Sequence, residues 1–158
     1  MKKLPLLIAV FFLILPASLP AENAFAPSSC IQGESGCITI KVCGLKNTIG
    51  QLGIALYSSK KGFPDNTETA LATRVRKISD TTQEFTFENI PFGSYAISVL
   101  HDENSNGRMD KFPILGIPKE GFGVSNNPKI RRGPPSFSES LFVLSAGEMK
   151  LSITMNYL

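Results

Sequence analysis

Apolar side chains occupy every second position in five separate runs of this chain, and this period of two limits the folds that the chain can adopt. The runs lie at residues 38–42, 52–56, 85–87, 95–99 and 151–157. Alternation of this kind is typical of β-strands that bury one face. Two weaker runs, 74–78 and 141–144, bring the expected number of strands to seven.

Helical spacing is not sustained in the sequence, and residues 65–71 are the best candidate for a short helix. A parallel sheet needs helices to cover its faces, so a chain of short strands without helices favours antiparallel packing. The sequence therefore predicts an all-β fold, a seven-stranded antiparallel β-sandwich of the immunoglobulin-like kind with one long irregular loop.

The first 21 residues are typical of a cleavable secretory signal peptide. Lys2 and Lys3 precede an apolar run at 4–15, which is shorter than the roughly 20 residues of a membrane-spanning helix. We expect cleavage after Ala21, with cleavage after Ala26 as the alternative. The mature protein is then periplasmic or secreted and is not an integral membrane protein. Residues 22–36 are polar and unpatterned, which predicts a flexible lead-in to a domain spanning 37–158.

The charge of the chain argues against nucleic acid as a partner. Sixteen Lys and Arg face thirteen Asp and Glu, a formal net charge of +3, and the excess nearly disappears once Lys2 and Lys3 are removed with the signal peptide. Proteins that bind nucleic acid neutralise many phosphates with clustered cations. The chain also has only one histidine, which excludes a zinc site rich in histidine within a single copy.

Export permits disulfides, and the chain has three cysteines, Cys30, Cys37 and Cys43. Cys37 and Cys43 flank the predicted strand 38–42, which would separate them by about 20 Å at roughly 3.3 Å per residue. That distance is too long for a disulfide. We therefore predict a Cys30–Cys37 disulfide with Cys43 left as a buried or half-buried thiol. A Cys30–Cys43 bond is the alternative.

Residues 102–139 do not follow the alternating pattern and are rich in glycine and proline. Connections longer than about 12 to 15 residues are usually functional or disordered in a compact domain. This one contains enough large apolar residues to pack, so we expect an ordered, irregular cap over one end or edge of the sandwich.

Residues 87–99, FENIPFGSYAISV, resemble the strand–turn–strand signature of transthyretin-like and carboxypeptidase-regulatory-like sandwiches. The continuation at 101–110, 115–127 and 133–137, together with Gly-Phe-Pro at 62–64, is similar to the exported bacterial family called domain of unknown function 2141 (DUF2141). The resemblance spans nearly the whole expected domain. It implies a secreted or periplasmic β-sandwich without an assigned activity, and the cysteine cluster departs from the family pattern.

The start of the long segment has the spacing of a calcium-binding loop. Oxygen-bearing side chains stand at positions 1, 3, 5 and 9 of an EF-hand-type loop, namely Asp102, Asn104, Asn106 and Asp110. Gly107 occupies the sixth position, but Pro113 stands where a bidentate carboxylate is needed. Calcium is the only cofactor that the sequence suggests. The alternative is a series of Asx-turns, in which Asn and Asp side chains bond their own backbone.

Six cations and two acids lie between residues 108 and 135. This local excess of positive charge predicts an anion-facing patch with Arg108, Lys129, Arg131 and Arg132 as candidate binding residues. Its partner in the cell envelope would be a glycan, a lipid head group or a protein. The alternative is a solvated loop whose arginines pair with nearby acids.

We interpret the chain as a non-catalytic exported protein that binds or docks through residues 102–139, and we assign no catalytic residue. A small secreted hydrolase is the rival, using His101 with Asp102 or Glu103. Sequence neighbours on a strand point to opposite faces, and the chain lacks a Gly-x-Ser-x-Gly nucleophile elbow. We therefore expect His101 to be a packed histidine at the start of the long segment. A purely structural module is the third reading.

Overall fold

The structure is a computed structural model that describes residues 33–131 and 133–158. The predicted signal peptide, its cleavage site and most of the lead-in lie outside the described residues. Within them the chain forms eight strands and two short helical segments: β1 (Ser35–Cys43), β2 (Gln51–Tyr57), the 3-10 turn η1 (Thr67–Thr69), β3 (Ala72–Lys77), β4 (Gln83–Pro91), β5 (Gly93–Asp102), β6 (Gly121–Val124), α1 (Phe137–Ser140), β7 (Phe142–Leu144) and β8 (Glu148–Thr154).

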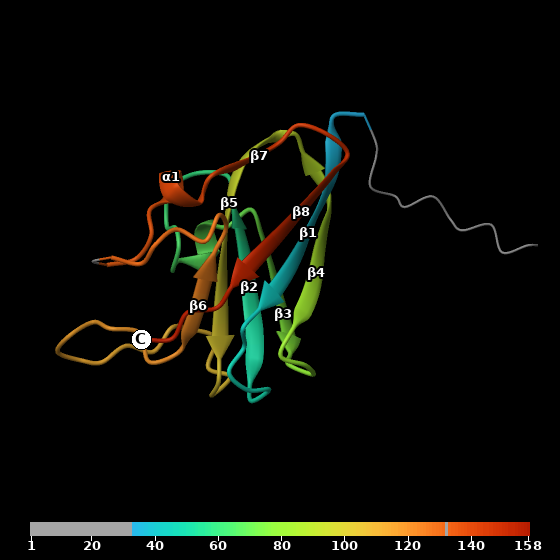
Figure 1. The fold of residues 1–158 in the computed structure, drawn as a ribbon. Helices are drawn as coiled ribbons and strands as arrows, with labels where there is room; N and C mark the ends of the chain where they lie inside the picture. The colour runs from blue at the N-terminus through green and yellow to red at the C-terminus, as the bar shows by residue number, and fades with distance from the viewer. Residues whose placement is uncertain (1–32, 132) are drawn as a thin grey trace, which may run out of the picture.

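The strands form two sheets that pack as a sandwich, as the sequence predicts (Figure 1). The smaller sheet has the order β4-β1-β8, and the larger has the order β3-β2-β5-β6 with β7 paired to the other end of β5. Two details differ from the prediction. There are eight strands instead of seven, and β1 pairs with β8 in parallel although the other pairs of strands are antiparallel.

The core lies between the two sheets and is built from the alternating residues. Four residues of β1 are fully buried, and three of them, Ile38, Ile40 and Val42, belong to the hydrophobic core. They meet the inward-facing residues of the larger sheet, among them Leu52, Leu56 and Ile97. Burying such a side chain contributes roughly 1.5–3 kcal/mol, which is why the period of two decides which face of each strand turns inward.

Hydrogen bonds and stacking close the two edges of the sandwich. At one edge, the amide of Phe122 in β6 donates to Asn156 O at 3.0 Å, and Asn156 N donates back to Phe122 O at 2.7 Å. At the other edge, the guanidinium groups of Arg74 and Arg76 in β3 lie over the rings of Phe87 and Phe85 in β4. The arginine stems therefore shield apolar surface where the sheets diverge.

The sequence pattern misses β6 because two of its four residues are glycines. A Cβ at Gly121 would overlap the ring of Tyr157, and a Cβ at Gly123 would lie 2.7 Å from Ile153 Cγ2. These glycines allow β6 to approach the end of the chain closely. In a sequence, glycines usually indicate a turn, so the strand is not recognised. The segment 102–139 is thus less irregular than expected.

The predicted helix at 65–71 is only the single turn η1. Residues 58–71 instead fold over the outer face of the larger sheet. Tyr57 Oη donates to Pro64 O at 3.1 Å, and the Phe63 ring packs edge-on against Tyr57 at 5.3 Å and against Phe137 at 5.7 Å. The loop and the long segment thus meet on the outer face, where Phe63 contacts Phe137.

Three consecutive polar residues, Ser125, Asn126 and Asn127, join the long segment to both sheets. Ser125 is fully buried, and its hydroxyl accepts from Ile97 N at 2.9 Å and donates to the carbonyl of Ser140. Asn127 donates to Ser152 O and accepts from Thr154 N, both at 2.8 Å. The Asn127 amide therefore satisfies the outer edge of β8 as a neighbouring strand would.

We predict that Ser125→Ala lowers the free energy of unfolding by about 1–3 kcal/mol, because it leaves the Ile97 amide and the Ser140 carbonyl unpaired. Urea denaturation followed by circular dichroism measures this loss. Ser145→Ala, at an exposed serine, is the matched control and should unfold like the parent protein. Equal stability of the two variants would show that the Ser125 bonds do not hold the segment.

Candidate functional site

A groove with a volume of about 650 Å³ lies on the outer face of the larger sheet. Its floor comes from small side chains on β2 and β5, Gly53, Ala55 and Ser98, flanked by larger residues such as Leu100 and Phe122. Gly53 and Leu100 are directly paired across the two strands. Small residues in the middle of a sheet face leave a depression, and the volume falls within the roughly 300–1,000 Å³ of small-molecule sites.

The walls of this groove come from the long segment and from the loop before η1. Met109, Leu115 and Ile117 line the groove, as do Ile130 and the prolines at 134–135. Apolar groups thus dominate the walls as well as the floor. The segment that the sequence singles out is therefore a cap, and it covers the outer face of the larger sheet instead of an end of the sandwich.

Two of the four predicted anion-facing residues, Arg108 and Arg131, line the groove. Both are exposed, and within the described residues neither guanidinium has an ion pair or a hydrogen bond. Lys129 is exposed but does not line the groove, and Arg132 lies outside the described residues. The prediction of a single patch of four cations therefore becomes a pair of arginines at the groove.

Other charged groups of the groove are already partnered. Lys111 pairs with Asp65 at 2.7 Å. Asp102 is 1% exposed, and its carboxylate accepts from Gln51 Nε2 at 2.8 Å, from Gly107 N at 2.7 Å and from Asn106 N at 3.0 Å. The charged side chains of the lining are four cations, Arg74, Arg108, Lys111 and Arg131, and two acids, Asp65 and Asp102, so the groove has an excess of positive charge.

The candidate calcium residues do come together in one loop. Asn104 and Asn106 both direct their amide nitrogens at Asp110 Oδ2, at 2.7 and 3.2 Å. Their oxygens accept from backbone amides two residues further on, each at 3.0 Å. This is the Asx-turn arrangement. Within the part of the chain that the structure describes, no group of three His, Cys, Asp or Glu side chains could hold a metal ion.

Sequence reasoning did not identify Glu120, which closes this loop. Glu120 is 5% exposed, and its two carboxylate oxygens accept from Glu103 N at 3.1 Å and from Asp110 N at 3.0 Å. A buried carboxylate must be hydrogen-bonded, and two backbone amides meet that need. The only signal in the sequence is an acid directly before the short β6 pattern, which is too weak to find it.

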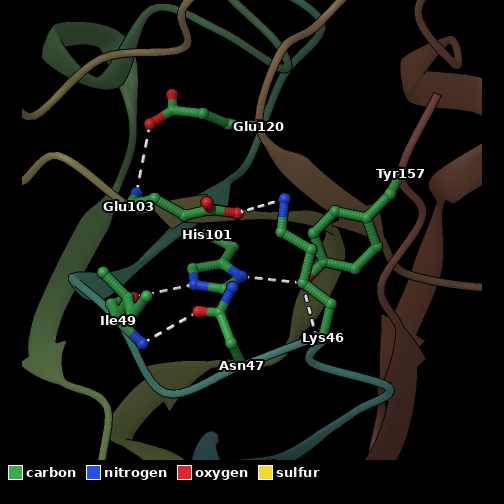
Figure 2. Close-up of polar contacts among 7 residues, drawn as sticks. All are labelled: Lys46, Asn47, Ile49, His101, Glu103, Glu120 and Tyr157. Atoms are coloured by element: carbon green, nitrogen blue, oxygen red, sulfur yellow. Dashed lines mark hydrogen bonds and ion pairs between the residues drawn. The ribbon is translucent and has the colours of Figure 1, made fainter.

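His101 is fully buried and does not line the groove, whereas its neighbour Asp102 does. Figure 2 shows the His101 ring between Ile49 and Tyr157. Nε2 lies 2.9 Å from Ile49 O, and a carbonyl can only accept, so Nε2 carries a proton. With the ring neutral, Nδ1 accepts from Tyr157 Oη at 2.7 Å, while Tyr157 Oη accepts from Lys46 N at 3.2 Å. Burial raises the pKa of Tyr157, which keeps its hydroxyl protonated as the donor.

Lys46 and Glu103 complete this cluster at the surface. Their ion pair measures 2.6 Å, and the Lys46 ammonium lies 4.9 Å from the centre of the Tyr157 ring. The cluster joins the β1–β2 connection, the end of β5 and the C-terminal residues. Its geometry is that of a structural histidine with both ring nitrogens in use.

The cysteines lie at the two ends of β1, where the sequence places Cys37 and Cys43. Cys37 is buried, and Cys43 is a half-buried free thiol. Cys30 lies outside the described residues, so the Cys30–Cys37 disulfide stays a prediction.

We expect millimolar calcium to leave the melting temperature of the protein unchanged, because the Asx-turns satisfy the loop without an ion. Differential scanning fluorimetry with calcium and then with a chelator tests this. A calcium-dependent rise that disappears in Asp110→Asn would contradict the expectation and establish a calcium loop.

We predict that Tyr157→Phe destabilises the protein by about 1–3 kcal/mol, because Nδ1 of the buried His101 loses its donor. Tyr95→Phe is the matched control. It also removes a phenol hydroxyl, but the lost partner is the carbonyl of the exposed residue Pro91, which water can reach. Chemical denaturation of both variants measures the change in the free energy of unfolding. An equal loss in the two would show that the Tyr157–His101 hydrogen bond stabilises the protein no more than the Tyr95–Pro91 bond does.

No curated protein and no solved structure matches this chain. None of the helices within the described residues is long and apolar enough to cross a membrane. One family matches, described as an uncharacterized protein conserved in bacteria (DUF2141), and the match covers residues 40–152. These residues contain all or part of every strand and the whole cap. The chain therefore belongs to the DUF2141 family.

Proposed function

We propose that this protein is an exported, non-catalytic binding protein of the bacterial cell envelope, and that its ligand occupies the groove between the larger sheet and the 102–139 segment. The ligand class is a small amphiphilic anion, with an apolar body and one acidic group. The observation that carries the proposal is the electropositive groove of about 650 Å³ with its apolar floor. Export rests on the signal-peptide pattern of the first 21 residues.

The chemistry of the groove supports this class of ligand. Leu100, Phe122 and Ile130 offer apolar surface to the body of a ligand. Arg108 and Arg131 are the charged groups that remain for an acidic group to reach, and a guanidinium binds carboxylates, sulfates and phosphates through two parallel hydrogen bonds. A neutral sugar has no such requirement, so the arginines favour an anion over an uncharged glycan.

The rival hydrolase would need His101 to act on a substrate. His101 is fully buried on the inner face of the sheet, and both of its ring nitrogens have partners. Asp102, the next residue, contributes to the groove on the outer face. A general base must reach the proton that it abstracts. The two residues therefore lie on opposite sides of the larger sheet, which supports binding over catalysis.

We expect the dye anilinonaphthalene sulfonate, which combines apolar rings with one sulfonate, to bind the folded protein saturably at one site. Gly53→Ile should abolish this binding, because the new side chain fills the floor of the groove. There is space for it, since the nearest atom to a Cβ at Gly53 is Leu100 Cβ at 4.0 Å, and isoleucine favours a strand. Fluorescence titration measures the effect, with thermal melts to confirm folding.

Thr86→Ile is the matched control, because Thr86 is an exposed strand residue on the smaller sheet. It should bind the dye like the parent protein. Arg131→Gln should weaken binding of the sulfonate dye but not of the uncharged dye Nile red, whereas Lys60→Gln, outside the groove, should change neither. Undiminished dye binding by Gly53→Ile would overturn the proposal.

A further inference from the structure

The part of the long segment at residues 111–119, here called the tip hairpin, projects from the body of the sandwich (Figure 1). Its two sides are bonded to each other. Phe112 N donates to Ile117 O and Gly116 N donates to Phe112 O, both at 2.9 Å, and Lys111 and Pro118 form an isolated β-bridge. The Lys111–Asp65 ion pair and the Lys119 N to Asp110 O bond hold its base. The tip hairpin is therefore an ordered projection.

The end of the tip hairpin presents large apolar side chains to solvent. Ile114 is 95% exposed, Leu115 is 70% exposed and Phe112 is 47% exposed. Single exposed apolar residues are common on protein surfaces, but a cluster on a projecting turn marks an interaction surface. A narrow convex turn fits a soft or concave partner, whereas a flat protein face would leave most of this surface uncovered.

Cations surround this apolar end. Lys111 and Lys119 flank it, with the Lys119 ammonium 5.1 Å from the centre of the Phe112 ring. Arg108 and Arg131 stand exposed on the same cap, and Lys129 adds a further exposed cation. Fewer acids lie nearby: Asp65 pairs with Lys111, and Asp110 keeps its charge while accepting from the two asparagine amides. The surface around the tip hairpin is therefore electropositive.

We propose that the tip hairpin docks the protein onto an anionic lipid bilayer, with Phe112, Ile114 and Leu115 inserted into the interface and the surrounding cations on the lipid head groups. Interfacial binding combines buried apolar area with attraction to anionic lipids, and this surface offers both. Two lysines flanking an apolar end match the depth profile of a bilayer, where the apolar region lies beneath the charged head groups.

The docking surface adjoins the ligand groove, because Leu115 and Ile117 of the tip hairpin also line the groove. Phe112 and Ile114 do not line the groove, and Gly53 at its floor is not part of the tip hairpin. A substitution at Ile114 or at Gly53 therefore changes one surface without replacing a residue of the other. Failure of the docking proposal leaves the proposed function untouched, and the reverse also holds.

The test is co-sedimentation of the purified protein, lacking the signal peptide, with vesicles of equimolar phosphatidylcholine and phosphatidylglycerol. Ile114→Asp should lower the partition coefficient about tenfold or more, since it replaces an isoleucine that inserts into the bilayer by a charge that the anionic surface repels. Gly53→Ile should bind vesicles like the parent, while Ile114→Asp should still bind anilinonaphthalene sulfonate.

Raising the salt from about 0.1 M to about 1 M should weaken vesicle binding, because the Debye length falls from about 10 to 3 Å.

The chain contains no tryptophan, so a single introduced tryptophan reports its own surroundings. The fluorescence of Ile114→Trp should shift to shorter wavelength when vesicles are added. Val143→Trp is the matched control at a residue of β7 that is 52% exposed, and its emission should not shift.

Two results would overturn the proposal. One is vesicle binding that is equal for the parent protein and Ile114→Asp, together with no shift for Ile114→Trp. The other is self-association through the same residues, seen by light scattering as a dimer of the parent that Ile114→Asp converts to a monomer. In that case the tip hairpin packs against a second copy of the chain.

Discussion

Backbone amides that have no strand or helix partner must still be hydrogen-bonded where water is excluded, and this constraint shapes the whole cap. Two buried carboxylates meet it. Asp102 accepts from the amides of Asn106 and Gly107, and Glu120 accepts from those of Glu103 and Asp110. Because these bonds fix both ends of the loop, they also fix one wall of the groove and the base of the tip hairpin. The shape of the groove and of the tip hairpin thus depends on two buried carboxylates, of which only Asp102 lines the groove.

The two faces of the larger sheet differ in how completely they are covered. Its inner face carries the core and the buried His101 with its Tyr157 partner. Its outer face is built from small residues at Gly53, Ala55 and Ser98 and is covered only in part. Substitutions on the outer face can therefore change the shape of the groove at little cost to the core. Such an arrangement allows one fold to serve different ligands.

The strands and the sandwich could be predicted because burial of one face leaves a period of two in the sequence. The other features depend on contacts between distant residues. Gly121 and Gly123 are glycines because of Tyr157 and Ile153, which lie about 30 residues later in the sequence. The groove likewise arises from small residues on two strands and from walls far from both. The Asp102–Asp110 spacing located a real loop but could not decide which groups its asparagine amides would face.

The parallel pairing of β1 with β8 joins the beginning of the domain to its end, over a separation on the order of a hundred residues. During synthesis β1 leaves the ribosome before β8, so it has no partner on that edge until almost the entire remaining polypeptide has been made. The smaller sheet is therefore the last part that can be completed. A chain interrupted shortly before its end would leave one edge of β1 with its backbone amides and carbonyls unpaired, and such an open edge can pair with another chain.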